Sequence, residues 1–224
     1  MNPGNPVVRL CAEGMQAEAE GRDGDARAAF EQAWEIAEDD YDACVAAHYV
    51  ARHQTTPQET LRWNQERLDR ADRVGDDRVK GFYASLHLNM AKAHADLGDP
   101  GRARRHYELA AAHVGEVPHG PYADWVRFAI AEGLRSAAGH GPRTGDALLR
   151  DLLAGFCARG DLKALGLVVP AYLADLGTEA DRMRLLTALR MLHAAGALPG
   201  EEQGALSAAI GSLHDDAPAT APRA

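Results

Sequence analysis

Apolar side chains recur at the spacing of an α-helix along most of the chain. Residues 7–20 place Val7, Cys11 and Gly14 three or four positions apart. Residues 25–38 align Phe30 with Ala33, Trp34 and Ala37 on one stripe, which is the pattern of a helix with one buried face. No segment alternates apolar and polar residues with the period of two that strands need. The pattern predicts an all-α protein of about ten or eleven helices.

Turn and cap residues divide this pattern into segments. Thr56 precedes Pro57 and Glu59, which is the order expected of an N-cap, a first helical position and a third one. Asp99 stands in the same place before Pro100. The expected helices cover residues 7–20, 25–38, 41–54, 57–74, 78–97, 100–114, 121–138, 144–158, 162–176, 178–195 and 201–213.

A triplet of a small residue, an aromatic and another small residue occurs twice with the same spacing. Ala26, Phe30 and Ala33 form the first copy, and the second is Ala103, Tyr107 and Ala110. Two antiparallel helices that pack closely need small residues where their axes approach and a large ring where they diverge. We therefore expect these alanines at helix crossings.

These positions resemble the tetratricopeptide repeat (TPR), whose pattern adds a small residue and a glycine before the triplet. Residues 84–117 fit with Ala91 and Gly98, and residues 7–40 fit with Gly14 and Gly21. Residues 41–74 depart from the pattern: there a histidine replaces the small residue, and polar residues replace the triplet (His48, Thr60, Asn64 and Arg67). Ala147 and Ala154 would belong to a fourth, degenerate copy.

The resemblance implies a right-handed α-α superhelix (a TPR-like solenoid) of antiparallel helix pairs. Its repeats would span about 7–40, 41–80 and 81–117 within residues 1–118. Residues 119–213 would hold the degenerate repeat and capping helices, because the end of a solenoid exposes apolar surface that needs a cover. Residues 214–224 are expected to be a flexible tail.

Charge and composition exclude some partners. The 224 residues carry a formal net charge of −9, which disfavours a generic nucleic-acid binder. No apolar run approaches the ~18 residues of a membrane span, and the start of the chain shows no signal-peptide pattern. The three cysteines (Cys11, Cys44 and Cys157) have no C-x-x-C spacing and fit reduced thiols. We expect a cytoplasmic protein.

Ligand contacts in the resembled family come from the first helix of each pair, on the concave face. Here these positions include Cys11, Met15, Glu18, Val45, Ser85 and Glu132, together with the groove residues that we single out: Tyr49, Arg52, His53, Leu88, Asn89, Lys92, Asp96 and Arg127. An asparagine such as Asn89 would bond a peptide backbone, and Lys92 and Arg52 would hold carboxylates. A full carboxylate clamp is not expected, because Val45 and Cys11 occupy its matching positions.

The sequence offers little catalytic chemistry. H-E-x-x-H, G-x-S-x-G and P-loop motifs are absent from the sequence, and the ten histidines have no metal-ligand spacing, so neither a metal nor a cofactor is expected. Cys44 and His48 lie four positions apart on one helix. We interpret this pair as packed neighbours rather than as a nucleophile and its base.

The favoured interpretation is a non-catalytic scaffold that binds a protein or peptide, and self-association stays open. The first alternative is a ligand- or peptide-sensing bacterial regulator with a partly polar pocket. The second is an enzyme or enzyme subunit with an unrecognised site, such as a tunnel lined by Tyr49, His53 and Trp125.

Overall fold

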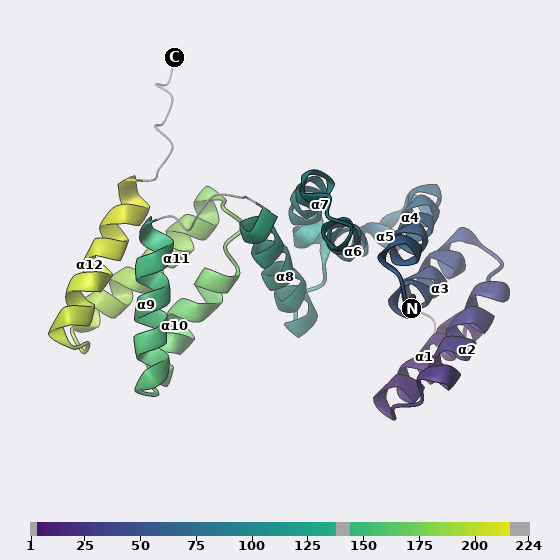
Figure 1. The fold of residues 1–224 in the computed structure, drawn as a ribbon, viewed down its shortest axis with the longest axis horizontal. Coiled ribbons are helices and arrows are strands. Elements are labelled where there is room, and N and C mark those ends of the chain that lie inside the picture. Colours follow the sequence, from purple (N-terminus) through teal and green to yellow (C-terminus); the bar gives the residue numbers. More distant parts are fainter. Residues whose placement is uncertain (1–3, 138–143, 216–224) are drawn as a thin grey trace, which may run out of the picture. The chain divides into compact units, whose positions relative to one another are not determined.

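The chain folds into helices in two compact units. The structure, a computed structural model, describes residues 4–137 and 144–215, and within these ranges it contains no strand. The all-α prediction is therefore confirmed. Unit 1 covers Met1–Ala137 and unit 2 covers Ala138–Ala224 (Figure 1). The helices are α1 (Pro6–Ala19), α2 (Asp23–Glu35), α3 (Asp40–Arg52), α4 (Pro57–Val74), α5 (Asp77–Lys80), α6 (Tyr83–Asp96), α7 (Pro100–His113), the short 3-10 turn η1 (Val114–Glu116), α8 (Pro121–Ala137), α9 (Thr144–Ala158), α10 (Leu162–Leu173), α11 (Glu179–Ala195) and α12 (Gly200–Asp215).

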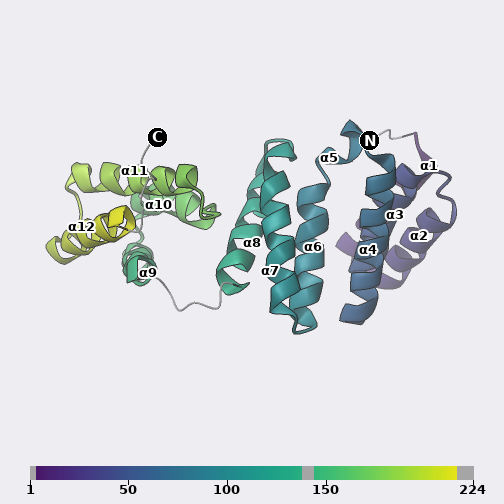
Figure 2. The same ribbon diagram turned by 90° about the horizontal axis from the view of Figure 1, so that it is seen from above.

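Unit 1 consists of helix hairpins that pack side by side. The pairs α1/α2, α3/α4 and α6/α7 are antiparallel, and α8 packs on the last of them (Figure 2). We call α1, α3, α6 and α8 the first layer of unit 1; within it α1 contacts α3 and α6 contacts α8. Helices α2, α4 and α7 form the other layer, and each packs against the first-layer helix that follows it. The sequence placed a boundary after residue 118, whereas α8 lies in unit 1.

The predicted caps are present. The side chain of Thr56 accepts a hydrogen bond from the backbone N–H of Glu59 at 3.3 Å, and Asp99 accepts one from Arg102 at 2.9 Å. Each satisfies a backbone donor that the first helical turn leaves unpaired.

The first small–aromatic–small triplet is completely buried. Ala26, Phe30 and Ala33 on α2 are 0% exposed. Gly14 on α1 faces the same ring, and a Cβ added there would lie 2.3 Å from Cε1 of Phe30. Only a residue without a side chain can stand at this point of the α1/α2 crossing.

The second triplet makes the same kind of contact with a different helix. Ala103 and Ala110 on α7 are 1% and 0% exposed, and Tyr107 between them is 7% exposed. A Cβ on Gly133 of α8 would lie 2.1 Å from Cε1 of Tyr107. The expected position of these alanines at helix crossings is confirmed.

The helix expected over residues 78–97 is wrong as a single element, because it breaks into α5 and α6. The backbone N–H of Phe82 bonds the Val79 carbonyl at 2.8 Å, which closes a tight turn between the two helices. Val79 is fully buried, and the ring of Phe82 stacks on Tyr41 with centroids 6.1 Å apart. Gly81 lies so close to the chain near Glu116 that a Cβ would be 3.3 Å from its carbonyl oxygen. These packing contacts outweigh the local preference for one long helix.

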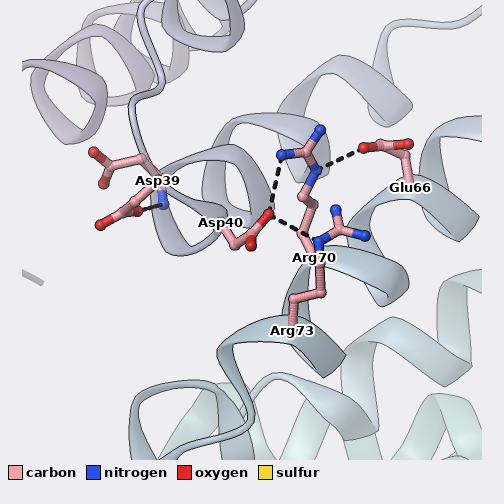
Figure 3. Close-up of polar contacts among 6 residues, drawn as sticks. Asp39, Asp40, Glu66, Arg70 and Arg73 are labelled. Atoms are coloured by element: carbon pink, nitrogen blue, oxygen red, sulfur yellow. Dashed lines mark hydrogen bonds and ion pairs between the residues drawn. The ribbon is translucent and has the colours of Figure 1, made fainter.

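Charged side chains join the two helices of the α3/α4 hairpin at its open end (Figure 3). The carboxylate of Asp40 accepts hydrogen bonds from Nη1 of Arg70 and Nε of Arg73, both at 3.0 Å. Nε of Arg70 also donates to Glu66 at 2.7 Å. These side chains are between about one-third and one-half exposed, so water screens their charges and they orient the hairpin more than they stabilise it.

Unit 2 packs α9, α10, α11 and α12 around a core that is richer in leucine. Its buried residues include Leu149, Leu152, Phe156, Val168, Leu185, Leu189 and Leu206. Ala147 is half-buried and Ala154 is exposed, in contrast to Ala103 and Ala110 of unit 1. Residues 216–224, which hold most of the expected tail, lie outside the described part of the chain.

The Gly133→Ala variant tests the packing of unit 1. The new methyl group meets the Tyr107 ring, so we expect the free energy of unfolding to fall by about 1–3 kcal/mol, less any gain in helix propensity. All three tryptophans of the chain (Trp34, Trp63 and Trp125) lie in unit 1, so a urea titration followed by tryptophan fluorescence reports on this unit.

Gly24→Ala is the matched control. Gly24 is a helical glycine of α2 with no atom within 4 Å of an added Cβ, so its replacement is expected to be neutral or slightly stabilising. Equal stabilities for Gly133→Ala and the wild type would contradict the close approach of α7 and α8.

Candidate partner-binding surface

The sequence-predicted groove residues divide into two clusters in unit 1. Tyr49 and Arg52 on α3, and His53 directly after it, lie beside Glu18 of α1. Asn89 and Lys92 lie on α6, next to α8. The remaining three differ: Leu88 of α6 is fully buried and cannot contact a partner, Asp96 is exposed on the last turn of α6, and Arg127 is half-buried on α8. Cys11 and Val45 are also core residues.

The α1/α3 cluster satisfies its own charges. The carboxylate of Glu18 accepts hydrogen bonds from Nη2 of Arg52 at 2.9 and 3.0 Å and lies 2.8 Å from Nε2 of His53. The ring of Tyr49 stacks on Phe30 at 4.9 Å between centroids. Arg52 was predicted to hold a ligand carboxylate, but its guanidinium already has one within the protein.

The α6/α8 cluster leaves its polar groups available. The ammonium of Lys92 lies 5.1 Å from the ring centroid of Trp125, and among the described residues no carboxylate pairs with it. The amide of Asn89 likewise has no hydrogen-bond partner in the part of the chain that the structure covers. Tyr122 and Trp125 stack 6.2 Å apart and are 54% and 53% exposed. We call Asn89, Lys92, Tyr122 and Trp125 the α6/α8 patch.

The sequence named three of the four patch residues and missed Tyr122. Trp125 was named as a residue that would line the tunnel of an unrecognised enzyme site. The tyrosine three positions before it is the signal that could have indicated an exposed aromatic pair. The sequence around Tyr122 and Trp125 does not show that α8 places these rings beside Lys92.

A second group of polar side chains is buried between α3, α4 and α6. Arg67 is 4% exposed and Asn64 is 2% exposed. Nη2 of Arg67 lies 3.4 Å from the hydroxyl of Ser85, whereas its Nε and Nη1 have no hydrogen-bond partner. Oδ1 of Asn64 and Nδ1 of His48 are also buried and unpaired. The sequence had marked Asn64 and Arg67 only as departures from the TPR pattern, and His48 as such a departure and as the neighbour of Cys44.

The Cys44/His48 pair lacks the electrostatics of a nucleophile and its base. Burial raises the pKa of the fully buried Cys44 thiol despite the nearby Arg67, so it favours the unreactive protonated form. Burial, followed by the charges of Arg67 and Arg52, lowers the pKa of His48 well below its usual value. The described contacts therefore favour two packed neighbours.

Histidines that are distant in sequence meet on α6 and α7. Nδ1 of His87 and Nδ1 of His106 lie 3.2 Å apart and share a hydrogen bond. The ring of His94 stacks on His106 at 5.3 Å, and His113 lies 6.0 Å from His87, again between centroids. From the sequence, the histidines were considered only for metal-ligand spacing, and that spacing does not indicate that these four meet.

The histidine cluster borders a hollow of about 420 Å³ between α4, α6 and α7. His94, His106, Arg62 and Arg102 are among the residues that line it. Within the described ranges, no group of three or more His, Cys, Asp or Glu side chains is arranged to hold a metal ion.

Comparison with known proteins adds no identity to this geometry. No family model, curated protein or solved structure matches the chain significantly. No helix in the part that the structure describes has the length and apolar character to cross a membrane.

From the histidine cluster we predict that acid lowers the free energy of unfolding of unit 1. Burial, with His106 and His113 nearby, lowers the pKa of His87 from 6.5 to about 4. Below pH 6.5, His87 binds a proton in the unfolded chain but not in the folded protein. The free energy of unfolding that His87 contributes above this pH is therefore lost as the pH falls toward 4. Replacing His87 with glutamine should remove roughly 1–2 kcal/mol of this decline, after allowance for solvent screening.

Urea titrations from about pH 7 to pH 4, followed by tryptophan fluorescence, measure this effect. His119→Gln is the control, because His119 is exposed in the turn before α8. An unchanged pH dependence in the His87 variant would show that folded His87 takes up its proton as readily as the unfolded chain.

Proposed function

We propose that unit 1 is a TPR-like solenoid and that the protein is a non-catalytic scaffold which binds a protein or peptide partner. The proposal is supported by the hairpin order of unit 1 and by the small and aromatic residues buried at its helix crossings. Stacked helix pairs expose an extended face made of one layer of helices, and such faces bind extended segments.

The α6/α8 patch is the observation that carries the partner-binding proposal. Two stacked aromatic rings, each more than half exposed, lie next to a cation without a carboxylate partner in the described chain. Aromatic side chains dominate the energetics of protein interfaces because they bury large areas at low cost in side-chain entropy. The unpaired amide of Asn89 adds a group that can bond a partner's backbone.

A ligand- or peptide-sensing regulator is the alternative that a specific observation favours. The unpaired polar atoms of Arg67, Asn64 and His48 are the features of a site that a small polar ligand would complete. An enzyme is a weaker alternative, because Cys44, the nucleophile considered from the sequence, is fully buried, and burial raises its pKa.

Affinity capture from a cell lysate tests the scaffold proposal. Wild-type protein is compared with Trp125→Ala and Lys92→Ala, and captured proteins are identified by mass spectrometry and then tested as purified proteins. We expect a direct partner whose affinity falls by about tenfold or more for Trp125→Ala, because an exposed aromatic anchor is worth ~2 kcal/mol. Lys92→Ala should weaken binding less, because its charge is exposed.

Lys163→Ala is the control for nonspecific charge effects, since Lys163 is exposed on α10 of unit 2. Partners that bind both patch variants with wild-type affinity would argue against this patch as the binding surface. Circular dichroism of each variant checks that the fold is intact.

A further inference from the structure

Arg67 is a buried cation for which the structure provides no anion. Its guanidinium belongs to α4, in the second layer of unit 1, and lies 5.9 Å from the ring centroid of Phe82. Nη2 contacts Ser85, and Nε and Nη1 have no acceptor of hydrogen-bond geometry. The thiol of Cys44 also interacts with the guanidinium, but burial raises the pKa of this thiol, so it does not supply the missing anion. No carboxylate in the part of the chain described by the structure is within ion-pair distance of it.

Such an arrangement is unfavourable unless a partner completes it. A buried charge loses its hydration, and burial accordingly lowers the pKa of Arg67. Each buried N–H without an acceptor adds its own desolvation cost. In TPR-like packing this position holds a small residue, so an apolar side chain could fill it without that cost.

Two other buried unpaired atoms of unit 1, Oδ1 of Asn64 and Nδ1 of His48, belong to side chains near this guanidinium. Asn64 lies one helical turn before Arg67 on α4, and Ser85 faces it from α6. His48 and Tyr49 on α3, and Tyr122 on α8, interact electrostatically with the guanidinium. Arg67 therefore reaches from the second layer toward the first, where Tyr122 is exposed.

We propose that the cluster formed by Arg67, Asn64, His48 and Ser85 is a binding site for a carboxylate. The carboxylate oxygens would accept the unpaired Nε–H and Nη1–H of Arg67. The hydroxyl of Ser85 already donates to the carbonyl of Phe82 at 2.9 Å and adds no donor, so Nδ2 of Asn64 would be the neutral donor. The site holds one formal positive charge, which balances a carboxylate but leaves a phosphate dianion with an excess buried charge. This site is distinct from the α6/α8 patch and does not require that the patch bind anything.

Sodium acetate is the probe, because Arg67 and Asn64 are buried and acetate is a small carboxylate with an apolar tail. We titrate the full chain with acetate at constant ionic strength, using sodium chloride as the balancing salt. Two signals are followed: the thermal unfolding midpoint, and the side-chain Nε–H resonance of Arg67 in ¹H–¹⁵N NMR spectra. Inorganic phosphate serves as the comparison anion.

We expect saturable acetate binding that raises the midpoint and shifts the Arg67 resonance. Arg67→Met should weaken acetate binding by about tenfold or more, and without acetate it should be at least as stable as the wild type. Asn64→Leu should weaken binding less than Arg67→Met. Retained binding in Trp125→Ala would show that this site is independent of the partner surface.

Two results would overturn the proposal. In the first, acetate shifts neither signal beyond the chloride control, so that only water completes the cluster. In the second, phosphate binds as well as acetate, so that the site does not select a carboxylate. If Arg67→Met fails to fold, the wild-type NMR titration decides between these outcomes, because it needs no variant.

To separate a free acid from a peptide as the source of the carboxylate, a short peptide ending in a free carboxylate is compared with its amidated form. Tighter binding of the free-acid peptide than of acetate identifies a peptide carboxylate as the ligand. Equal binding of acetate and the free-acid peptide identifies a small acid.

Discussion

The fit of an aromatic ring against a residue with no side chain determines how closely the helices of unit 1 approach. Phe30 occupies the space above Gly14, and Tyr107 occupies the space above Gly133, so that a single added methyl group would overlap either ring. Alanines on both sides of each ring keep the neighbouring turns equally close. Because protein interiors are packed densely, this contact fixes the spacing of the hairpins and therefore which side chains of α6 and α8 lie beside each other.

The α3/α4 hairpin keeps the same packing positions but fills them with polar side chains. Asn64 and Arg67 are as buried as the alanines and rings at the matching positions of α2 and α7. The fold therefore tolerates unpaired polar atoms in the middle of unit 1, supported by apolar crossings before and after them. Binding sites commonly contain unfavourable local contacts whose cost in stability is offset by the surrounding core. In this view the irregular hairpin is the part of unit 1 that most directly concerns ligand binding.

Sequence patterns predicted the helices, their caps and the buried triplets, because these depend on residues within a few turns of one another. The break between α5 and α6 was not predictable, since it depends on Tyr41 and on the chain near Glu116, which are distant in sequence. For the same reason the sequence indicated Arg52 as a free cation, whereas Glu18 on another helix pairs with it. His87 and His106 meet across the α6/α7 hairpin, and the angle at which the two helices cross determines their contact.

A double-mutant cycle on Gly14 and Phe30 tests the central packing claim most directly. Gly14→Ala, Phe30→Leu and the double variant are unfolded with urea, and tryptophan fluorescence reports on unit 1. The smaller leucine makes room for the new methyl group. The account therefore predicts that the free energy of unfolding falls less in the double variant than in the two single variants added together, by about 1 kcal/mol or more. Strictly additive changes would contradict it, because they would mean that the glycine and the ring do not meet.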